Sequence, residues 1–594
     1  MRFITLIISS LLIIQCSSSM RSKDAAITAN ELNEHLSFLA SDKMEGRKPG
    51  SSQSQIAAQY IADHFRQLGL DLLGEDGFQN FDIVTSVSLG KGNHFISGAI
   101  SGTPGQDYTP TAFSASTSLD GEVVFAGYGF QIENDSIQWN DYGDVDVKGK
   151  WVMILRGTPE SEGAGDRYAA HSTLRHKVLM ARDNGASGVI FISGEKFDKD
   201  DDLMSLHMER NFSLDALPII HVKRSLADQL LQTTGKTISD LELQFEKQPA
   251  ASSFSAGVTL SVATEIIQHT ASAQNVIGML KGSDPVLAHE FIVVGAHYDH
   301  LGWGGPGSGS RKPDTKAIHN GADDNASGVS AVLEIAERFS LEKSRPKRSI
   351  VFVAFAAEEM GLLGSKFFTS SPLIEIKNVK QMFNLDMVGR LDPQSKALTV
   401  GGTGTAKGME EFLSSMKEES GLILSMTPDG YGPSDHASFY VENIPVLFFF
   451  TGITEEYHTP DDDVETINFE GEKLIADFAY DLIREIASMD QTMAFQEAGP
   501  KGPPQGGKSG KVKMGIIPDF AAANSQGFLL GGVVPGGPAA FAGMQKGDVM
   551  ISMEGRSIKN VYDYMGRMSE VKLGQRITVE VLRGDQKLIL IVQL

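Results

Sequence analysis

Cysteine is almost absent from this chain of 594 residues, which contains only Cys16. A disulfide bond within one chain is therefore excluded. Basic residues are also scarce, since 52 Lys and Arg stand against 75 Asp and Glu, a formal charge of −23. Nucleic-acid binding rests mainly on basic side chains that neutralise phosphates, so no nucleic-acid partner is expected.

An apolar run long enough to span a bilayer is missing from the N-terminal segment. Residues 4–14 are apolar but too few, and the early Arg before them and the small polar residues after them fit a secretory signal. Cys16 closes this segment of residues 1–16, as in a bacterial lipoprotein signal, although Gln15 differs from the small residue usual at that position. The alternatives are a lipid anchor on Cys16, ordinary secretion and an incidental cysteine. The first two predict an exported protein, in the bacterial cell envelope (periplasm or lipid-anchored outer membrane) or secreted.

The chain is too long for a single hydrophobic core, which predicts three or four domains. Residues 30–70 show helical periodicity on both sides of a polar loop, SDKMEGRKPGS. Residues 113–265 alternate short β-like runs with one amphipathic segment and contain no cluster of His, Asp and Glu with ligand spacing. We interpret them as a mixed α/β insert without chemistry of its own. The enclosing domain resumes near residue 275 and alternates strands with helices up to residue 488, which predicts α/β/α layers.

Residues 496–510 are rich in Gly and Pro and show no apolar period, so they are predicted to be a linker. The net charge changes from negative to positive after this linker. Residues 508–594 contain 11 Lys and Arg against 7 Asp and Glu, a net of +4, which leaves −27 for the rest of the chain. Such a shift at a linker marks a domain boundary, and short strands with one helix near residues 559–570 follow it.

The stretch FIVVGAHYD (residues 291–299) concentrates the predicted chemistry. Four apolar residues indicate a strand buried on both faces, and Gly295 and Ala296 bring His297 and Asp299 out at its carboxyl end. With a period of two, both side chains point the same way. The Asp299 carboxylate is therefore expected to accept a hydrogen bond from one nitrogen of His297 and leave the other for a metal. Alone, such a pair is more often a surface hydrogen bond.

Four later stretches also place potential ligands at the ends of apolar runs. They contain Asp323-Asp324-Asn325, Glu358-Glu359, Asp386, and His458 beside Tyr457. Each has a structural interpretation of its own, such as a helix cap or a solvated turn, but five such stretches in α/β order favour one site. Two His and three carboxylates suit zinc. Five residues supply three ligands to each of two ions if one carboxylate bridges them, which predicts a two-metal site with a shared hydroxide as nucleophile.

Five ordered motifs, HYDHLGWGG, GADDNASG, AFAAEEMGLLGS, NLDMVG and YHTPDD, closely resemble those of the family M28 zinc aminopeptidases. The resemblance implies a zinc-peptidase domain with a mixed sheet over residues 25–112 and 266–490. HLSFLASDKMEGRKPG resembles that family too, which implies that this loop borders the active site. Residues 301–319 form a longer loop than many family members have.

The resemblance also implies a role for each site residue. His297 and Asp386 would hold one zinc ion, Glu359 and His458 the other, and Asp324 rather than Asp323 would bridge them. Glu358 would be the general base and then the proton donor to the leaving amine, Asp299 would orient His297, and Tyr457 would hydrogen-bond the oxyanion. The peptide bond after the bridging residue is often cis in the family. Four further side chains are interpreted as structural or supporting rather than as ligands: His300, His319, Asp435 and His436.

Two further domains are expected from resemblance. Residues 113–265 resemble a protease-associated (PA) domain, which implies a lid or a substrate-access element. Residues 511–594 resemble a small, mainly β PDZ domain, which would bind an extended peptide or a protein C-terminus by strand addition, with GFLLGGVV as the binding strand and loop. The alternative is that this domain only packs on the rest of the protein.

The sequence therefore predicts a metal-dependent exopeptidase, a di-zinc aminopeptidase that hydrolyses the first peptide bond of peptides with a free N-terminus. One alternative is a catalytically inactive peptide-binding scaffold. Others keep the metal but change the reaction, as in a carboxypeptidase or a glutaminyl-cyclase-like transferase with a single zinc. All five ligands and the base Glu358 are present, which favours the enzyme.

Overall fold

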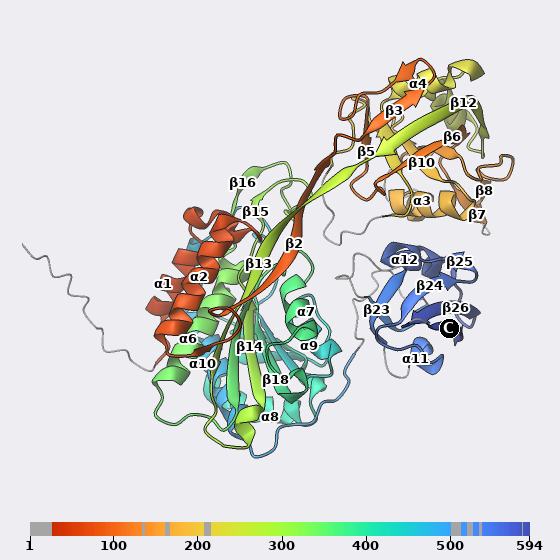
Figure 1. Ribbon diagram of the computed structural model, residues 1–594. Helices are drawn as coiled ribbons and strands as arrows, with labels where there is room; N and C mark the ends of the chain where they lie inside the picture. Colours follow the sequence, from red (N-terminus) through yellow and green to blue (C-terminus); the bar gives the residue numbers. More distant parts are fainter. Residues whose placement is uncertain are drawn as a thin grey trace, which may run out of the picture.

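The computed structural model describes residues 26–133, 137–160, 167–206, 215–499, 512–518, 527–533, 537–584 and 586–594. The predicted signal and Cys16 lie outside these residues, as does most of the predicted linker. Figure 1 shows a large α/β body, a second α/β body at the end of a long two-stranded arm, and a small β body beside the second. None of the described helices is long and apolar enough to cross a membrane.

The predicted peptidase domain is built on one mixed sheet. Its strand order is β1-β13-β17-β14-β18-β21-β19-β20, and β2 pairs with β13. The central strands β17, β14, β18 and β21 run parallel. Strand β13 runs antiparallel to β17, and β19 runs antiparallel to β21 but parallel to β20. The strands are β1 (Asp71–Leu72), β2 (Phe78–Leu89), β13 (Ile266–Leu280), β14 (Phe291–His297), β17 (Ser349–Phe355), β18 (Val379–Leu385), β19 (Ala397–Gly401), β20 (Ile423–Thr427) and β21 (Val446–Phe450).

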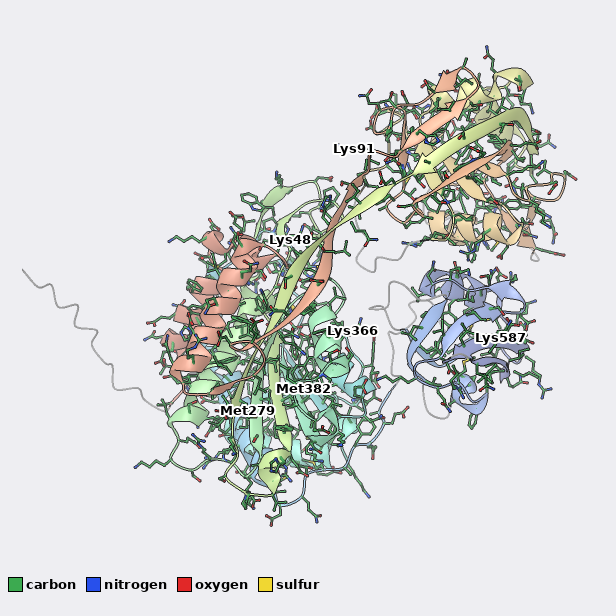
Figure 2. The ribbon with its side chains drawn as sticks, viewed as in Figure 1. Lys48, Lys91, Met279, Lys366, Met382 and Lys587 are labelled. Atoms are coloured by element: carbon green, nitrogen blue, oxygen red, sulfur yellow. The ribbon has the colours of Figure 1, made fainter. Side chains whose placement is uncertain are left out.

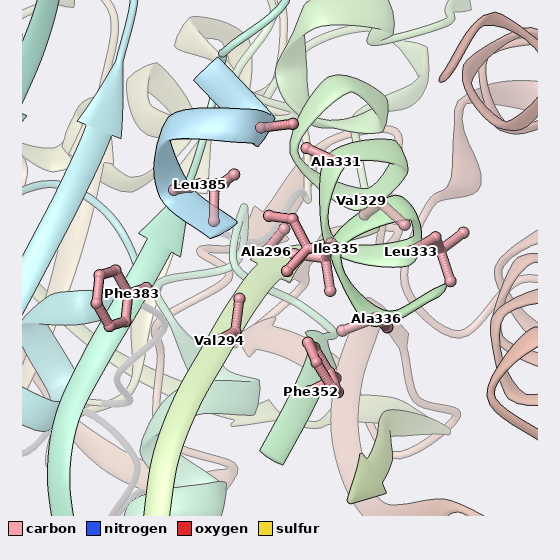
Figure 3. Packing of buried hydrophobic residues seen from close by; sticks show 14 of the residues in the cluster. Val294, Ala296, Val329, Ala331, Leu333, Ile335, Ala336, Phe352, Phe383 and Leu385 are labelled. Atoms are coloured by element: carbon pink, nitrogen blue, oxygen red, sulfur yellow. The ribbon is translucent and has the colours of Figure 1, made fainter. Parts of the chain in front are cut away.

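Helices cover both faces of this sheet, so the predicted α/β/α layers are present. The larger layer contains α1 (Ala29–Leu39), α2 (Ser52–Gln67), α6 (Gly328–Leu341), α8 (Met409–Ser420) and α10 (Phe469–Ser488). The opposite face carries α7 (Leu363–Ser370) and α9 (His436–Val441). Figure 3 shows Val329, Leu333 and Ile335 of α6 packed on Val294 and Phe352 of the sheet. Because β14 and β17 are buried on both faces, their polar groups emerge only where the strands end.

The predicted PA domain has an eight-stranded sheet of order β4-β3-β12-β6-β9-β10-β11-β5. Its strands are β3 (His94–Ser97), β4 (Ile100–Ser101), β5 (Tyr108–Pro110), β6 (Thr117–Ala126), β9 (Trp151–Leu155), β10 (Gly188–Ile192), β11 (Ile219–Val222) and β12 (Ser253–Thr264), with a separate hairpin of β7 (Gln131–Glu133) and β8 (Gln138–Asn140). Its helices are α3 (Leu174–Asp183), α4 (Arg224–Leu231) and α5 (Ile238–Lys247).

The predicted boundary at residues 112 and 113 cuts through this second sheet. Strands β3, β4 and β5 precede it in the chain, yet they pair with β12 and β11 of the second sheet. The crossing between the two bodies is made by β2 and β13, which pair antiparallel over most of their length and form the arm in Figure 1. The structural boundary therefore lies near residue 90, at the end of β2.

The predicted PDZ domain is a small, mainly antiparallel β fold, as expected. It contains β22 (Ile516–Pro518), β23 (Phe528–Val533), β24 (Val549–Met553), β25 (Arg556–Ser557), β26 (Arg576–Arg583) and β27 (Gln586–Gln593), with helices α11 (Pro538–Phe541) and α12 (Val561–Glu570). The expected binding strand GFLLGGVV corresponds to β23, which is paired on both sides, with β22 and β24. A strand with two neighbours has no free edge, so this assignment is wrong. Among the described strands, β22 is the one at that edge of the sheet.

The PA and PDZ domains contact each other through α3 and α12, which face each other in Figure 1. The Arg567 guanidinium is fully buried and donates to both carboxylate oxygens of Asp183. Arg182 pairs in parallel with Asp563 of the PDZ domain and Asp215 of the PA domain. Paired charges at the contact give it a defined geometry.

Candidate metal centre

The predicted ligands meet at the carboxyl edge of the parallel strands. β14, β17 and β18 are neighbours with a common direction, so residues that follow them come together. The fifth segment, after β21, closes over the same edge. The structure thereby gathers the whole predicted ligand set, whose members are buried: His297, Asp324, Glu359, Asp386 and His458.

Two groups of potential ligands form among the described residues, and Asp324 belongs to both. In the first, His297 Nε2 lies 3.3 Å from Asp324 Oδ1 and 3.4 Å from Asp386 Oδ1. In the second, His300 Nδ1 lies 3.0 Å from Glu359 Oε1 and 3.8 Å from Asp324 Oδ2. His458 stands beside this second group, with its Nε2 3.2 Å from Asp324 Oδ2 and 3.1 Å from Glu359 Oε1. Each oxygen of Asp324 therefore faces a different group, which is the arrangement of a bridging carboxylate.

These spacings fit a divalent cation. Zinc binds nitrogen and oxygen ligands at about 2.0–2.1 Å, so two ligands at tetrahedral angles lie about 3.3 Å apart. Distances of 3.1–3.4 Å between the imidazole nitrogens and carboxylate oxygens match this value. Burying so many carboxylates together is costly without a compensating positive charge. The residues present therefore fit two zinc ions.

Asp323 is turned away from both groups. Its Oδ1 accepts hydrogen bonds from the backbone N–H of Gly389 and the hydroxyl of Ser327. The Asp462 carboxylate accepts from the backbone N–H groups of Asp323 and Asp324 and thereby positions the turn. The peptide bond between Asp324 and Asn325 is cis. The choice of Asp324 over Asp323 in the sequence thus agrees with the orientation of the two side chains.

The support of His297 differs from the prediction. Its Nδ1 lies 3.2 Å from the backbone oxygen of Asp299, whereas the nearest carboxylate oxygen is 3.9 Å away. The Asp299 carboxylate instead accepts from the backbone N–H groups of Glu358 and Glu359. The reason is that β14 ends at His297, so the alternation of a strand does not continue to Asp299. Burial raises the pKa of Asp299 to about 6.

Glu358 lies beside the first group and is fully buried. Burial raises its pKa well above the usual range, the carboxylates of Glu359 and Asp435 add to this rise, and His297 opposes it. Burial likewise raises the pKa of Asp435 to about 7. A buried carboxyl group whose pKa is raised binds a proton more readily than an ordinary one, as the role predicted for Glu358 requires.

The three remaining predicted side chains lie around the centre. The Tyr457 ring stacks on His458 with ring centroids 3.8 Å apart. His436 is buried and stacks on Phe448, and burial lowers its pKa to about 3. His319 is held by Ser310 Oγ at 2.8 Å and by the carbonyl of Ala317. His319 and His436 thus have structural contacts and belong to neither ligand group.

His300 and Arg47 stand within the motifs HYDHLGWGG and HLSFLASDKMEGRKPG, yet the sequence predicted no ligand role for His300 and no role for Arg47. His300 is fully buried, and its Nδ1 lies 3.0 Å from Glu359 Oε1, inside the second group. The sequence feature that could have indicated this location is its position, directly after Asp299 and three residues after His297. Arg47, in the loop MEGRKPG, is also fully buried, and no charge pattern in the sequence indicated it.

Arg47 ties the N-terminal loop to the metal centre. Its guanidinium donates to the carbonyls of Tyr298 (2.7 Å), Leu39 (2.5 Å), Asn320 (2.7 Å) and Gly321 (2.9 Å). Tyr298 stands between His297 and Asp299, and Gly321 leads into the turn of Asp324. The loop therefore borders the centre, as the resemblance implied.

A cavity of about 260 Å³ opens beside the second ligand group. Its wall contains His300 and Glu359 together with Lys48, and Lys48 lies where the arm leaves the peptidase domain (Figure 2). The rest of the lining is mostly small or apolar and includes Pro49, Val87, Leu301, Met360 and Leu206 of the PA domain. Residues 304–309 of the long loop form one side, so this loop contacts the cavity.

A mixed α/β/α fold with two buried histidine and carboxylate groups at the carboxyl edge of its strands defines a metal-dependent hydrolase. Family models identify the domains: residues 275–483 match peptidase family M28, residues 119–230 match the PA domain, and residues 520–594 match the PDZ domain. The chain thus carries an M28 peptidase domain with an inserted PA domain and a C-terminal PDZ domain.

Several named proteins are similar to parts of this chain. Aminopeptidase YwaD of Bacillus subtilis (strain 168) is 27% identical over 478 residues, which cover 77% of this chain and 84% of YwaD. Leupeptin-inactivating enzyme 1 of Streptomyces exfoliatus is 29% identical over 198 residues, 33% of this chain and 40% of that enzyme. The solved structure of BSAP, a zinc aminopeptidase from Bacillus subtilis, shares 23% identity at a TM-score of 0.46, over 78% of this chain and 96% of that one.

Proposed function

We propose that this protein is a zinc aminopeptidase that removes the first residue of peptides with a free N-terminus. The observation that carries the proposal is the pair of buried ligand groups that share Asp324, one oxygen in each. The relative YwaD, named an aminopeptidase, supports the choice of reaction.

Zinc ions held by these groups would polarise the substrate carbonyl and acidify the attacking water. Glu358 takes the proton from that water and delivers it to the leaving amine, because its buried carboxyl group has a raised pKa. Asp299 fixes the backbone of Glu358 and Glu359 and so holds the base in place. Tyr457 is proposed as a donor to the oxyanion.

The cavity beside the second group is proposed to receive the side chain of the substrate's first residue. Away from His300, Glu359 and Lys48, its lining has no charged side chain and includes Val87, Leu206, Leu301 and Met360, which favours apolar first residues. Leu206 brings the PA domain into the wall of the cavity, which supports the role of that domain as a substrate-access element. The α-amine would be held by carboxylates of the centre.

Two further proposals concern the ends of the chain. The N-terminal segment with Cys16 would direct export, with or without lipid anchoring. The PDZ domain would bind an extended peptide or a protein C-terminus, and the outer edge of β22 is the strand edge available for it.

The test combines zinc content by elemental analysis with hydrolysis of a panel of aminoacyl-nitroanilides before and after chelation. We expect about two ions per chain and chelator-sensitive release. Glu358→Gln should lose turnover by about a hundredfold or more while keeping its zinc, since it removes only the proton shuttle. Glu455, an exposed residue close to Tyr457 in the sequence, provides the matched control, because Glu455→Gln should leave turnover and zinc content unchanged. One ion per chain would favour the cyclase-like transferase, and zinc-free, inactive protein would favour the scaffold.

A further inference from the structure

His300 is a buried imidazole whose polar atoms are not accounted for by the protein. The side chain has no exposed surface, and neither ring nitrogen has a hydrogen-bond partner among the described residues. A buried polar group without a partner is costly, by about 1–3 kcal/mol. Such a group indicates that something outside the polypeptide satisfies it.

The atoms around Nδ1 of His300 indicate what kind of partner would satisfy this nitrogen. Nδ1 lies 3.0 Å from Glu359 Oε1 and 3.8 Å from Asp324 Oδ2, two carboxylate oxygens of the second ligand group. The contact with Glu359 is short enough for an ion pair, yet Nδ1 has no hydrogen-bond partner among the described residues. A nitrogen lone pair and a carboxylate oxygen this close repel each other unless a proton or a metal ion lies between them. His458 Nε2 stands at 3.1 Å from the same oxygen, so the nitrogens of His300 and His458 both approach Glu359 Oε1, and the two rings lie 5.7 Å apart between centroids.

The packing of the ring holds it in this position. A Cβ atom on Gly321 would come within 2.5 Å of the His300 ring, so the backbone of residue 321 lies directly against it. The φ angle of Gly321 is +58°, which favours glycine, and this residue leads into the turn that carries Asp324. The His300 ring is therefore packed between Glu359 and the turn that carries Asp324, and this packing restricts its rotation.

We infer that His300 is a fourth protein ligand of the second metal ion, beside Asp324, Glu359 and His458. The first group offers three residues, His297, Asp324 and Asp386, and so leaves a coordination position open. Four protein ligands instead make a closed site of the kind that holds zinc tightly. The two ions would then differ: the ion at the second group is retained, and the ion at the first group exchanges more readily. This inference rests on the proposed function, since it concerns the same pair of ions.

His300 is also expected to be the weakest of the three imidazole ligands. The Nδ1 atoms of His297 and His458 are within hydrogen-bonding distance of the carbonyls of Asp299 and Gly309. Such a bond orients a ligating imidazole and raises its basicity, and losing one typically costs ten- to a hundredfold in metal affinity. Nε2 of His300 has no such acceptor among the described residues. Its removal should therefore weaken the second site without abolishing it.

The test compares His300→Gln with His319→Gln in the full chain. His319 is equally buried and close in sequence, but its two nitrogens contact Ser310 and Ala317 rather than the ligand groups. Zinc affinities are measured by competition with a chelator, and circular dichroism checks the fold. We expect about a ten- to hundredfold loss at the tighter site in His300→Gln and no change in His319→Gln. Equal affinities in His300→Gln and the unchanged protein would overturn the inference, whereas a native chain that binds no zinc would overturn the proposed function instead.

A second measurement uses the unchanged protein, so it does not depend on the folding of a variant. Cobalt replaces zinc, and the exchangeable imidazole N–H resonances shifted by the paramagnetic ions are counted by NMR. Three ligating histidines, His297, His300 and His458, give three such resonances. Two resonances would mean that His300 is only packed beside the site, and would overturn the inference.

Discussion

Replacing Arg47 with lysine tests how the N-terminal loop supports the metal centre. The change keeps the positive charge, so any loss of stability or of zinc affinity reflects the geometry of the hydrogen bonds. The guanidinium of Arg47 donates to four backbone carbonyls in a region with no exposed surface. A lysine has a single nitrogen atom, which cannot reach four carbonyls that surround a planar fork. About two carbonyls would be left without a donor.

The magnitude follows from these orphaned acceptors. Each buried carbonyl without a partner costs about 1–3 kcal/mol, so Arg47→Lys should lower the free energy of unfolding of the peptidase domain by about 2–6 kcal/mol. For a domain of this size 1 kcal/mol shifts Tm by about 2–4 °C, which predicts a fall of roughly 4–24 °C. Two of the freed carbonyls belong to Tyr298 and Gly321, next to His297 and ahead of Asp324. Zinc affinity should therefore fall as well.

Scanning calorimetry of the full chain provides the assay, and the transition of the peptidase domain is recognised as the one that added zinc raises. Arg66→Lys is the matched control, because Arg66 is about half exposed and its guanidinium pairs with the exposed Asp63. The control should change stability by less than about 0.5 kcal/mol. If Arg47→Lys also stays within 1 °C of the native protein, the four hydrogen bonds do not stabilise the domain and the reasoning fails.

Two further predictions concern charge. Glu472 is fully buried against Ser330, and burial raises its pKa to about 8, above an unfolded value of about 4.3. The native state therefore retains a proton that the unfolded state gives up, and the free energy of unfolding falls as the pH rises from about 4.3 to about 8. The Tm of Glu472→Gln should exceed that of the native protein by a margin that grows from pH 5 to pH 8. A margin that stays constant over this range would refute the prediction. Asp183→Asn removes the partner of the buried Arg567 and should loosen the contact between the PA and PDZ domains by about 3 kcal/mol, seen as a larger radius of gyration in X-ray scattering. Asp490→Asn, at an exposed ion pair, is the control, and equal radii for both variants would contradict the prediction.

The metal centre was predictable because its residues follow buried strands. Apolar runs such as residues 291–294 identify the strands, and neighbouring parallel strands bring their carboxyl ends together, so His297, Glu359 and Asp386 had to meet. The mixed α/β/α layers followed from the same runs and from the helical periods between them.

Other features depended on contacts that leave no local pattern. Strands β3, β4 and β5 have two to four residues each, too few for a period, and this hid the true start of the PA sheet. Arg47 is surrounded by backbone carbonyls, which any sequence supplies, so no partner residue marked its burial. The pairing of β23 on both sides and the orientation of Asp299 likewise depend on where neighbouring strands begin and end.

The contact between α3 and α12 has a mechanical consequence for the whole molecule. The peptidase domain holds the PA domain through the arm of β2 and β13, the chain itself joins the peptidase domain to the PDZ domain, and α12 rests on α3. The PDZ domain is thus connected to the peptidase domain both along the chain and through its contact with the PA domain. A pull on the PDZ domain by a bound peptide would therefore bear on the PA domain and, through Leu206, on the wall of the cavity beside the metal ions.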